Sequence, residues 1–196
     1  MITYLSHGTI HPQWIHLSYK ASDAWTDREI DNNFGWSPSL AINSEGTPGI
    51  GFSSGTRKQP VYVVKSPKDG DWKTQPWDVH AIGDIGNTTT FTPTDFFPTL
   101  LYTGSEQIAR VIFYHAPDGE IRHAFTPDKN NLNTWTIEPV KTGVSAGWVS
   151  AAYDSSRDTI GVCWYDTIGK TLRYQEKPSG GVWGPAEQVD TSLNDT

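Results

Sequence analysis

The chain contains little sulfur and no long apolar run. One cysteine and one methionine occur in 196 residues. Cys163 therefore has no partner for an internal disulfide, and its position in the middle of an expected strand indicates a small core residue. The longest apolar runs, such as residues 61–64, have the length of a strand and are too short to span a membrane. The first seven residues have neither the basic nor the apolar region of a secretion signal.

Positive charge is scarce as well. The 15 Lys and Arg residues are outnumbered by 22 Asp and Glu residues, and the formal net charge is −7. The cations form no cluster along the sequence. Because binding to a phosphate backbone requires clustered Lys and Arg, nucleic acid is not an expected partner.

Helical periodicity is also missing, since no apolar period of 3.6 residues continues over ten residues. Short apolar stretches bounded by turn signals recur instead, and residues 43–46, Asn-Ser-Glu-Gly, are one such turn. In one full copy the expected strands are residues 39–42, 49–53, 61–65 and 72–79. The sequence therefore predicts an all-β protein.

Four tryptophans mark a repeat: Trp25, Trp72, Trp135 and Trp183. The first two are 47 residues apart and the last two 48, while the middle gap of 63 leaves room for an insertion of about 15 residues. A period near 47 residues is typical of a four-stranded propeller blade. An aromatic residue that recurs once per blade most often packs between neighbouring blades, and we interpret these four tryptophans in that way.

The repeat predicts a single β-propeller domain over residues 1–196 with about four repeats of antiparallel strands. The expected blades cover about 1–33, 36–83, 96–143 and 148–190, with an insertion at 84–95. The first blade lacks its inner strand in this register. Three explanations stay open: the last residues close a small ring, a second copy completes a larger ring as a homodimer, or the chain is part of a longer propeller.

Aromatic residues outside the period are candidates for ligand binding. Trp36, Phe96, Phe97 and Trp148 each stand in the connection that leads into a first strand. In a propeller this connection lies near the central channel or between blades. Flat aromatic faces beside short polar residues suit sugar rings, so these four side chains either contact a glycan or fill the mouth of the channel. Trp36 and Trp148 are the stronger candidates for ligand binding.

Neither a catalytic group nor a metal site is predicted from a motif. His7 and His11 have the spacing of a helical ligand pair, but they span Gly8 and stop at Pro12, so they belong to an expected hairpin loop, and no cysteine accompanies them. The insertion at 84–95 is rich in Asp, Asn and Thr, and a long irregular loop in an economical repeat is often functional. No cofactor is expected, but the oxygen atoms of this loop are suitable ligands for a calcium ion, so calcium binding stays an alternative.

Two segments resemble known protein families, and each resemblance implies a function. The run Ser66-Pro67-Lys68-Asp69-Gly70-Asp71-Trp72 resembles the Asp box of bacterial extracellular propellers of the sialidase-like kind. This resemblance implies an extracellular or surface-associated propeller.

The second resemblance covers one blade. Arg110-Val111-Ile112, followed by Asp118-Gly119-Glu120-Ile121-Arg122-His123, is similar to the strand pair of fucose-binding propeller lectins. The resemblance implies that Arg110 donates to sugar hydroxyls. His123 stands where those lectins place a sugar-binding glutamate, and it is the second candidate of this strand pair.

Three functions follow from these observations. The first is a non-catalytic recognition module for a glycan or another cell-surface ligand. The second is a structural propeller that joins chains in an assembly. The third is a sialidase-like or five-bladed glycoside hydrolase, which needs paired carboxylates in a deep pocket or three arginines on one face. The scattered arginines of this sequence disfavour an enzyme.

Overall fold

The computed structural model describes residues 1–8, 11–21, 23–31, 35–54, 61–67, 71–84 and 98–190. Residues 85–95 of the expected insertion, together with Phe96 and Phe97, lie outside the described residues. Within the described residues the regular structure is β-strand, apart from one 3-10 turn at Ala116–Asp118. No helix there is long and apolar enough to cross a membrane.

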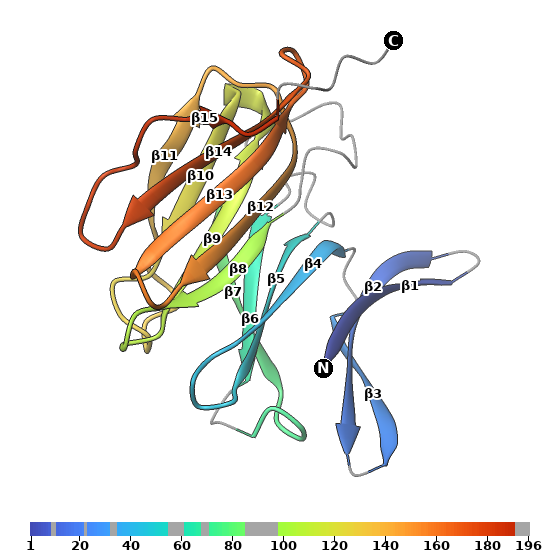
Figure 1. Cartoon of the computed structure of the whole chain (residues 1–196). Coiled ribbons are helices and arrows are strands. Elements are labelled where there is room, and N and C mark those ends of the chain that lie inside the picture. The colour runs from blue at the N-terminus through green and yellow to red at the C-terminus, as the bar shows by residue number, and fades with distance from the viewer. Residues whose placement is uncertain are drawn as a thin grey trace.

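The strands form four antiparallel sheets, each built from strands that are consecutive in the chain (Figure 1). The first sheet has three strands: β1 (Ile2–Gly8), β2 (His11–Ala21) and β3 (Ala24–Asp31). The second has β4 (Gly35–Ile42), β5 (Pro48–Ser54), β6 (Val61–Pro67) and β7 (Trp77–Asp84). The third has β8 (Thr99–Thr103), β9 (Ile108–His115), β10 (Glu120–Phe125) and β11 (Thr136–Thr142). The fourth has β12 (Ala146–Asp154), β13 (Thr159–Asp166), β14 (Thr171–Pro178) and β15 (Glu187–Gln188).

Local sequence explains the turns between these strands. Between β4 and β5, the Asn43 side chain accepts hydrogen bonds from the backbone N–H groups of Glu45 and Thr47 at 3.1 and 2.8 Å. Gly46 completes this turn with φ of +80°, a conformation that side chains with a Cβ rarely adopt. The predicted turn at residues 43–46 is therefore confirmed.

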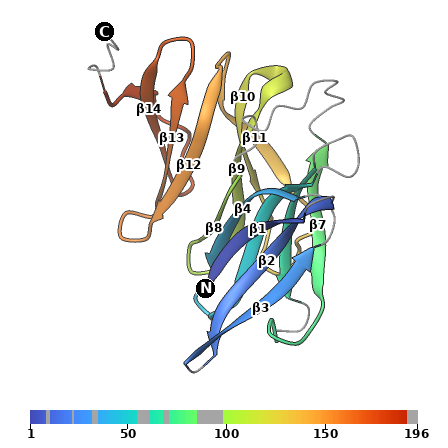
Figure 2. The same ribbon diagram turned by 90° about the vertical axis from the view of Figure 1, so that its right-hand side faces the viewer.

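Neighbouring sheets pack face to face through apolar clusters. Ile15 and Phe52 belong to a cluster between the first and second sheets, and Leu100 and Phe113 to one between the second and third. The largest cluster joins the third and fourth sheets and contains Trp164. The first strands of the sheets, β1, β4, β8 and β12, contact one another in chain order. Figure 2 shows the fourth sheet standing beside the third.

The side chains of strand β9 lie alternately on the two faces of the third sheet. Val111 and Phe113 point towards the second sheet, whereas Ile112 and Tyr114 point towards the fourth. All four side chains are buried, which matches the two-residue period of a strand covered on both sides. By the same alternation Arg110 shares the face of Ile112 and lies towards the fourth sheet.

Three of the four periodic tryptophans pack against the preceding sheet. Trp72 meets Tyr19 of the first sheet edge-to-face at 4.8 Å between ring centroids, and Trp135 packs on the cluster shared with the second sheet. Trp183 meets His123 of the third sheet edge-to-face at 5.7 Å. Trp25 differs, because its side chain is 57% exposed. The packing interpretation therefore agrees with three positions and is wrong for Trp25.

The prediction of an all-β fold with four-stranded antiparallel sheets is confirmed. The first sheet contains three strands, as the repeat register requires when one inner strand is missing. Closure of the four sheets into a propeller remains a prediction, as do the domain bounds. The described strands of the sheets span 2–31, 35–84, 99–142 and 146–188.

Candidate functional site

A cavity of about 540 Å³ lies between the third and fourth sheets. It is formed by one end of each sheet, where β9 and β13 begin and β8, β10, β12 and β14 end. The side chains that matter for its chemistry are Arg110, Phe125, Tyr153, Asp158 and Lys177. Its volume falls within the range of about 300–1,000 Å³ that is usual for small-molecule sites.

Strand pairing places Arg110 on the cavity wall. Arg110 pairs with Phe125 on β10, and Ile112 pairs with His123. Directly opposed residues of antiparallel strands point to the same face, so Arg110, Phe125 and His123 all face the fourth sheet. The Arg110 guanidinium lies over the Phe125 ring, 5.2 Å from its centroid.

The Arg110 guanidinium is held by neutral groups. Its Nε donates to Thr103 Oγ1 at 2.5 Å, and its Nη1 donates to His123 Nε2 at 3.2 Å. Because arginine has no acceptor, His123 Nε2 must accept, and the histidine proton must lie on Nδ1. His123 Nδ1 then donates to Glu138 Oε1 at 2.9 Å. In this series of hydrogen bonds Arg110 therefore donates to His123, and His123 donates to Glu138.

Burial changes the pKa of both His123 and Arg110. Burial lowers the pKa of His123 to about 4; the hydrogen bond to Glu138 opposes this shift, and the charge of Arg110 adds to it. His123 is thus neutral at pH 7 and accepts from Arg110 without competing for a proton. Burial also lowers the pKa of Arg110, against the nearby charges of Glu138 and Asp158.

Glu138 is the common acceptor behind the cavity wall. Its Oε1 accepts from His123, from Lys177 Nζ, and from Trp183 Nε1 at 3.1 Å. Burial alone would raise the pKa of Glu138, but the hydrogen bonds from Lys177 and His123 hold that pKa below its ordinary value. Glu138 therefore neutralises Lys177 and joins the third sheet to the fourth.

The opposite wall carries an acceptor. Tyr153 donates its hydroxyl hydrogen to Asp158 Oδ1 at 2.7 Å and accepts from the backbone N–H of Gly104 at 3.0 Å. The hydrogen bond from Tyr153 lowers the pKa of Asp158, which is charged at pH 7. Asp158 and Arg110 influence each other electrostatically, but they are not in ion-pair contact.

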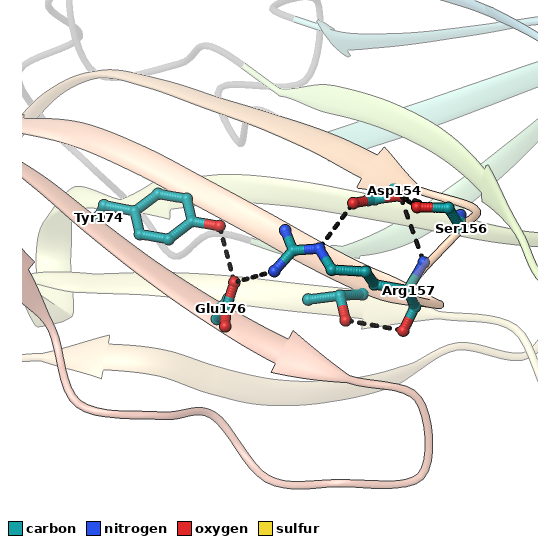
Figure 3. Close-up of polar contacts among 6 residues, drawn as sticks. Asp154, Ser156, Arg157, Tyr174 and Glu176 are labelled. Carbon is teal, nitrogen blue, oxygen red and sulfur yellow. Dashed lines mark hydrogen bonds and ion pairs between the residues drawn. The ribbon is translucent and has the colours of Figure 1, made fainter.

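Arg157 of the fourth sheet, unlike Arg110, is paired with carboxylates (Figure 3). Its Nε donates to Asp154 Oδ2 at 2.7 Å, and its Nη1 lies 3.5 Å from Glu176 Oε2, which also accepts from the Tyr174 hydroxyl. This arginine therefore has two carboxylates in contact. Arg110 has none among the described residues, although it is the more buried of the two.

The structure separates the predicted ligand-binding residues. It brings Arg110 and His123 together, but His123 is fully buried behind Arg110 and supports it without lining the cavity. Trp148 lies near the other end of β12, far along the strand from Tyr153. The side chain of Trp36 lies outside the described part of the structure, as do Phe96 and Phe97.

Trp36 and Trp148 do not occupy equivalent positions. Trp36 pairs with Ser53 before a bulge in β4, whereas Trp148 stands inside the matching bulge of β12, after Gly147 pairs with Tyr165. The two tryptophans were predicted as one class because both stand in the connection that leads into a first strand. When the two bulges are aligned, Gly147 matches Trp36, and Trp148 matches Ser37.

Sequence reasoning missed most of the cavity wall. Tyr153, Asp158 and Lys177 come from the fourth sheet, and Glu138 comes from the last strand of the third. They meet Arg110 only because two sheets pack face to face. No local motif marks them.

The described residues form neither a metal-ligand cluster nor an arginine cluster. Within the described residues no three His, Cys, Asp or Glu side chains form a group able to hold a metal ion. The described arginines are dispersed: Arg28 donates to the backbone carbonyls of Trp72 and Gln75, and Arg122 pairs with Asp118 and Glu120. The described part of the chain does not form the arginine triad of a sialidase.

Comparison with known proteins gives a structural similarity and no sequence family. No protein-family model and no curated protein match the sequence. Among solved structures, a GH62 hydrolase in complex with xylotriose is similar, with a TM-score of 0.50 and 13% sequence identity. The match covers 79% of this chain and 51% of that structure, so the chain spans about half its length. At this identity the similarity concerns the fold alone.

Proposed function

We propose that this chain is a non-catalytic carbohydrate-recognition module and that the cavity between the third and fourth sheets binds a sugar. The observation that carries the proposal is Arg110. Its part-buried guanidinium faces the cavity, is fixed by neutral acceptors and, within the described part of the chain, has no carboxylate in contact. Because buried charges are normally paired, this arrangement leaves N–H donors ready for a ligand.

The walls of the cavity fit a sugar in three respects. Arg110 presents donors and Asp158 an acceptor, so adjacent hydroxyl groups of a sugar can bridge the two walls. The rings of Phe125 and Tyr153 offer apolar surface next to them. The hydrogen bonds of Arg110, His123 and Glu138 fix the donors before the ligand arrives, which reduces the entropic cost of binding.

The wider context agrees with this proposal. Four successive antiparallel sheets, whose first strands contact one another in order, are the arrangement expected of propeller blades. We therefore propose a propeller of the extracellular, Asp-box kind. The similar GH62 hydrolase was solved with xylotriose, which makes xylo-oligosaccharides reasonable first ligands to test.

Arg110→Gln is expected to weaken sugar binding. Hydrogen bonds to a charged group contribute about 1.5–3 kcal/mol, so the affinity should fall roughly 10- to 100-fold. A glycan array that includes xylotriose identifies the ligand, and titration calorimetry measures the change. The matched control is Arg157→Gln, because Arg157 is outside the cavity. Equal affinity of Arg110→Gln and wild type, or no glycan bound by wild type in any oligomeric state, would contradict the proposal.

Assembly of chains is a second candidate function, and the exposure of Trp25 favours it. At the three equivalent positions a tryptophan packs on the preceding sheet, whereas Trp25 is 57% exposed. A sheet of a second copy that packs on Trp25 would repeat the contact already made three times within the chain.

Solution mass tests the assembly function. If copies join in this way, light scattering is expected to show a dimer or larger species for wild type and a monomer for Trp25→Ser. Trp148→Ser replaces another exposed tryptophan and should leave the mass unchanged. A monomeric wild type at high protein concentration would rule out assembly through Trp25.

A further inference from the structure

Trp148 is a large apolar side chain held in solvent by a strained backbone. It is 63% exposed and has φ of +50°, a value that bulky residues rarely adopt. It stands in the bulge of β12, whose neighbours Gly147 and Val149 are both buried. The bulge therefore keeps Val149 in the core while it turns Trp148 outwards. Such outliers persist where the surrounding structure enforces them, often at functional positions.

The chain contains an internal comparison for this position. The bulge of β4 has the same register, and its equivalent residue, Ser37, also has φ of +50°. The bulge is thus a feature of the repeat that a serine satisfies. Folding does not require a tryptophan at residue 148, and its ring gains little from burial there. The choice of tryptophan needs a reason other than the fold.

A hollow of about 330 Å³ opens beside the Trp148 ring. Its wall includes Tyr114, Ser145 and Thr167, and Tyr165 lies next to Trp148 with 6.2 Å between ring centroids. Among the described residues, none that is charged at pH 7 lines it. Thr167 donates its hydroxyl hydrogen within this wall, to Ser145. The hollow thus combines a flat aromatic face with small, neutral polar groups.

We infer that Trp148 and this hollow form a second binding site, which takes a neutral saccharide ring. The apolar face of a pyranose stacks on an exposed indole, and its hydroxyl rim reaches hydroxyl and carbonyl groups such as those of Ser145 and Thr167. A charged ligand would find no counter-ion in the wall. The Arg110 cavity, by contrast, presents Arg110, Asp158 and Lys177.

The two sites lie at opposite ends of the same strands. On β12 the second site uses Trp148 and the first uses Tyr153; on β9 the second uses Tyr114 and the first Arg110. One chain therefore offers two chemically different contacts, and this inference does not depend on the ligand of the Arg110 cavity. Separation along the strands allows a glycan to occupy each site independently.

Ligand-observed saturation-transfer NMR tests the second site with xylotriose, cellotriose and maltotriose as neutral probes and trigalacturonic acid as a charged one. Wild type is expected to bind at least one neutral probe. Trp148→Ser should weaken that binding at least tenfold, and because serine already fills the equivalent bulge, the fold should be retained. Trp25→Ser, the matched exposed-tryptophan control, should bind as wild type does. Arg110→Gln should retain the part of the neutral-probe binding that Trp148→Ser removes, whichever sugar the Arg110 cavity takes.

Three results would overturn the inference. The first is that wild type binds none of the neutral probes, and the second is that Trp148→Ser binds them as wild type does. The third is that binding is lost equally in Trp148→Ser and Trp25→Ser. Loss of neutral binding in Arg110→Gln alone would assign the sugar to the other cavity and leave Trp148 without this role. Circular dichroism of each variant confirms that the β-structure is intact.

Discussion

Trp164→Ala is expected to lower the free energy of unfolding by about 3–5 kcal/mol, the usual cost of removing a large buried aromatic side chain. Trp164 is 1% exposed and is the largest fully buried side chain among the described residues. It lies in the apolar cluster that joins the third and fourth sheets. The alanine variant would leave a cavity in this interface, because neighbouring strands are too well paired to close it. Denaturant titration followed by circular dichroism measures the change.

Two variants make this result specific. Trp164→Phe is expected to cost much less, because it keeps a ring in the cluster and removes an indole N–H that has no hydrogen-bond partner among the described residues. Trp148→Ala should change stability by no more than about 0.5 kcal/mol, since its side chain is largely in solvent. A Trp164→Ala variant as stable as Trp148→Ala would show that this cluster does not hold the two sheets together.

Stability is expected to fall as the pH falls from about 6.5 to about 4, and His123 should be a main cause. Its pKa in the folded protein is about 4, whereas an unfolded histidine titrates near 6.5. Between these values the unfolded chain binds a proton that the folded chain does not, so lowering the pH favours unfolding. Below pH 4 this proton uptake lowers the free energy of unfolding by about 3 kcal/mol, and above pH 6.5 the effect is absent.

The measurement compares unfolding curves of wild type and His123→Gln at pH 7 and at pH 4.5. The glutamine variant is expected to be less stable at pH 7, because it loses the ring packed against Trp183 and Phe125. Its further loss of stability at pH 4.5 should be smaller than that of wild type by about 2 kcal/mol or more. Equal losses in the two proteins would mean that folding does not lower the pKa of His123.

The repeat was predictable because it is written in the sequence at a constant spacing. Trp72, Trp135 and Trp183 fix the register of the sheets, and each performs the same packing role. The pairing of Arg110 with the His123 strand was also predictable, because both belong to one hairpin around a short turn. Local spacing is sufficient for contacts of this kind.

The rest of the site depends on contacts that no local spacing encodes. Lys177 reaches Glu138 from 39 residues away, and Trp183 reaches it from 45. Their meeting depends on the angle at which two sheets pack. The grouping of Trp36 with Trp148 had a different weakness, since a bulge adds one residue to a strand without a mark in the sequence. One residue is enough to change the face on which a side chain lies.

The order of the sheet contacts has a thermodynamic consequence. Among the described residues, extensive contacts run from each sheet to the next in the chain, so we expect stability to be approximately a sum of units and nearest-neighbour couplings. The Arg110 cavity lies at one of these couplings, with a wall from each of two units. A ligand there would act as a clamp on that coupling. It would oppose separation of the fourth sheet from the third and leave the coupling between the first and second sheets unchanged.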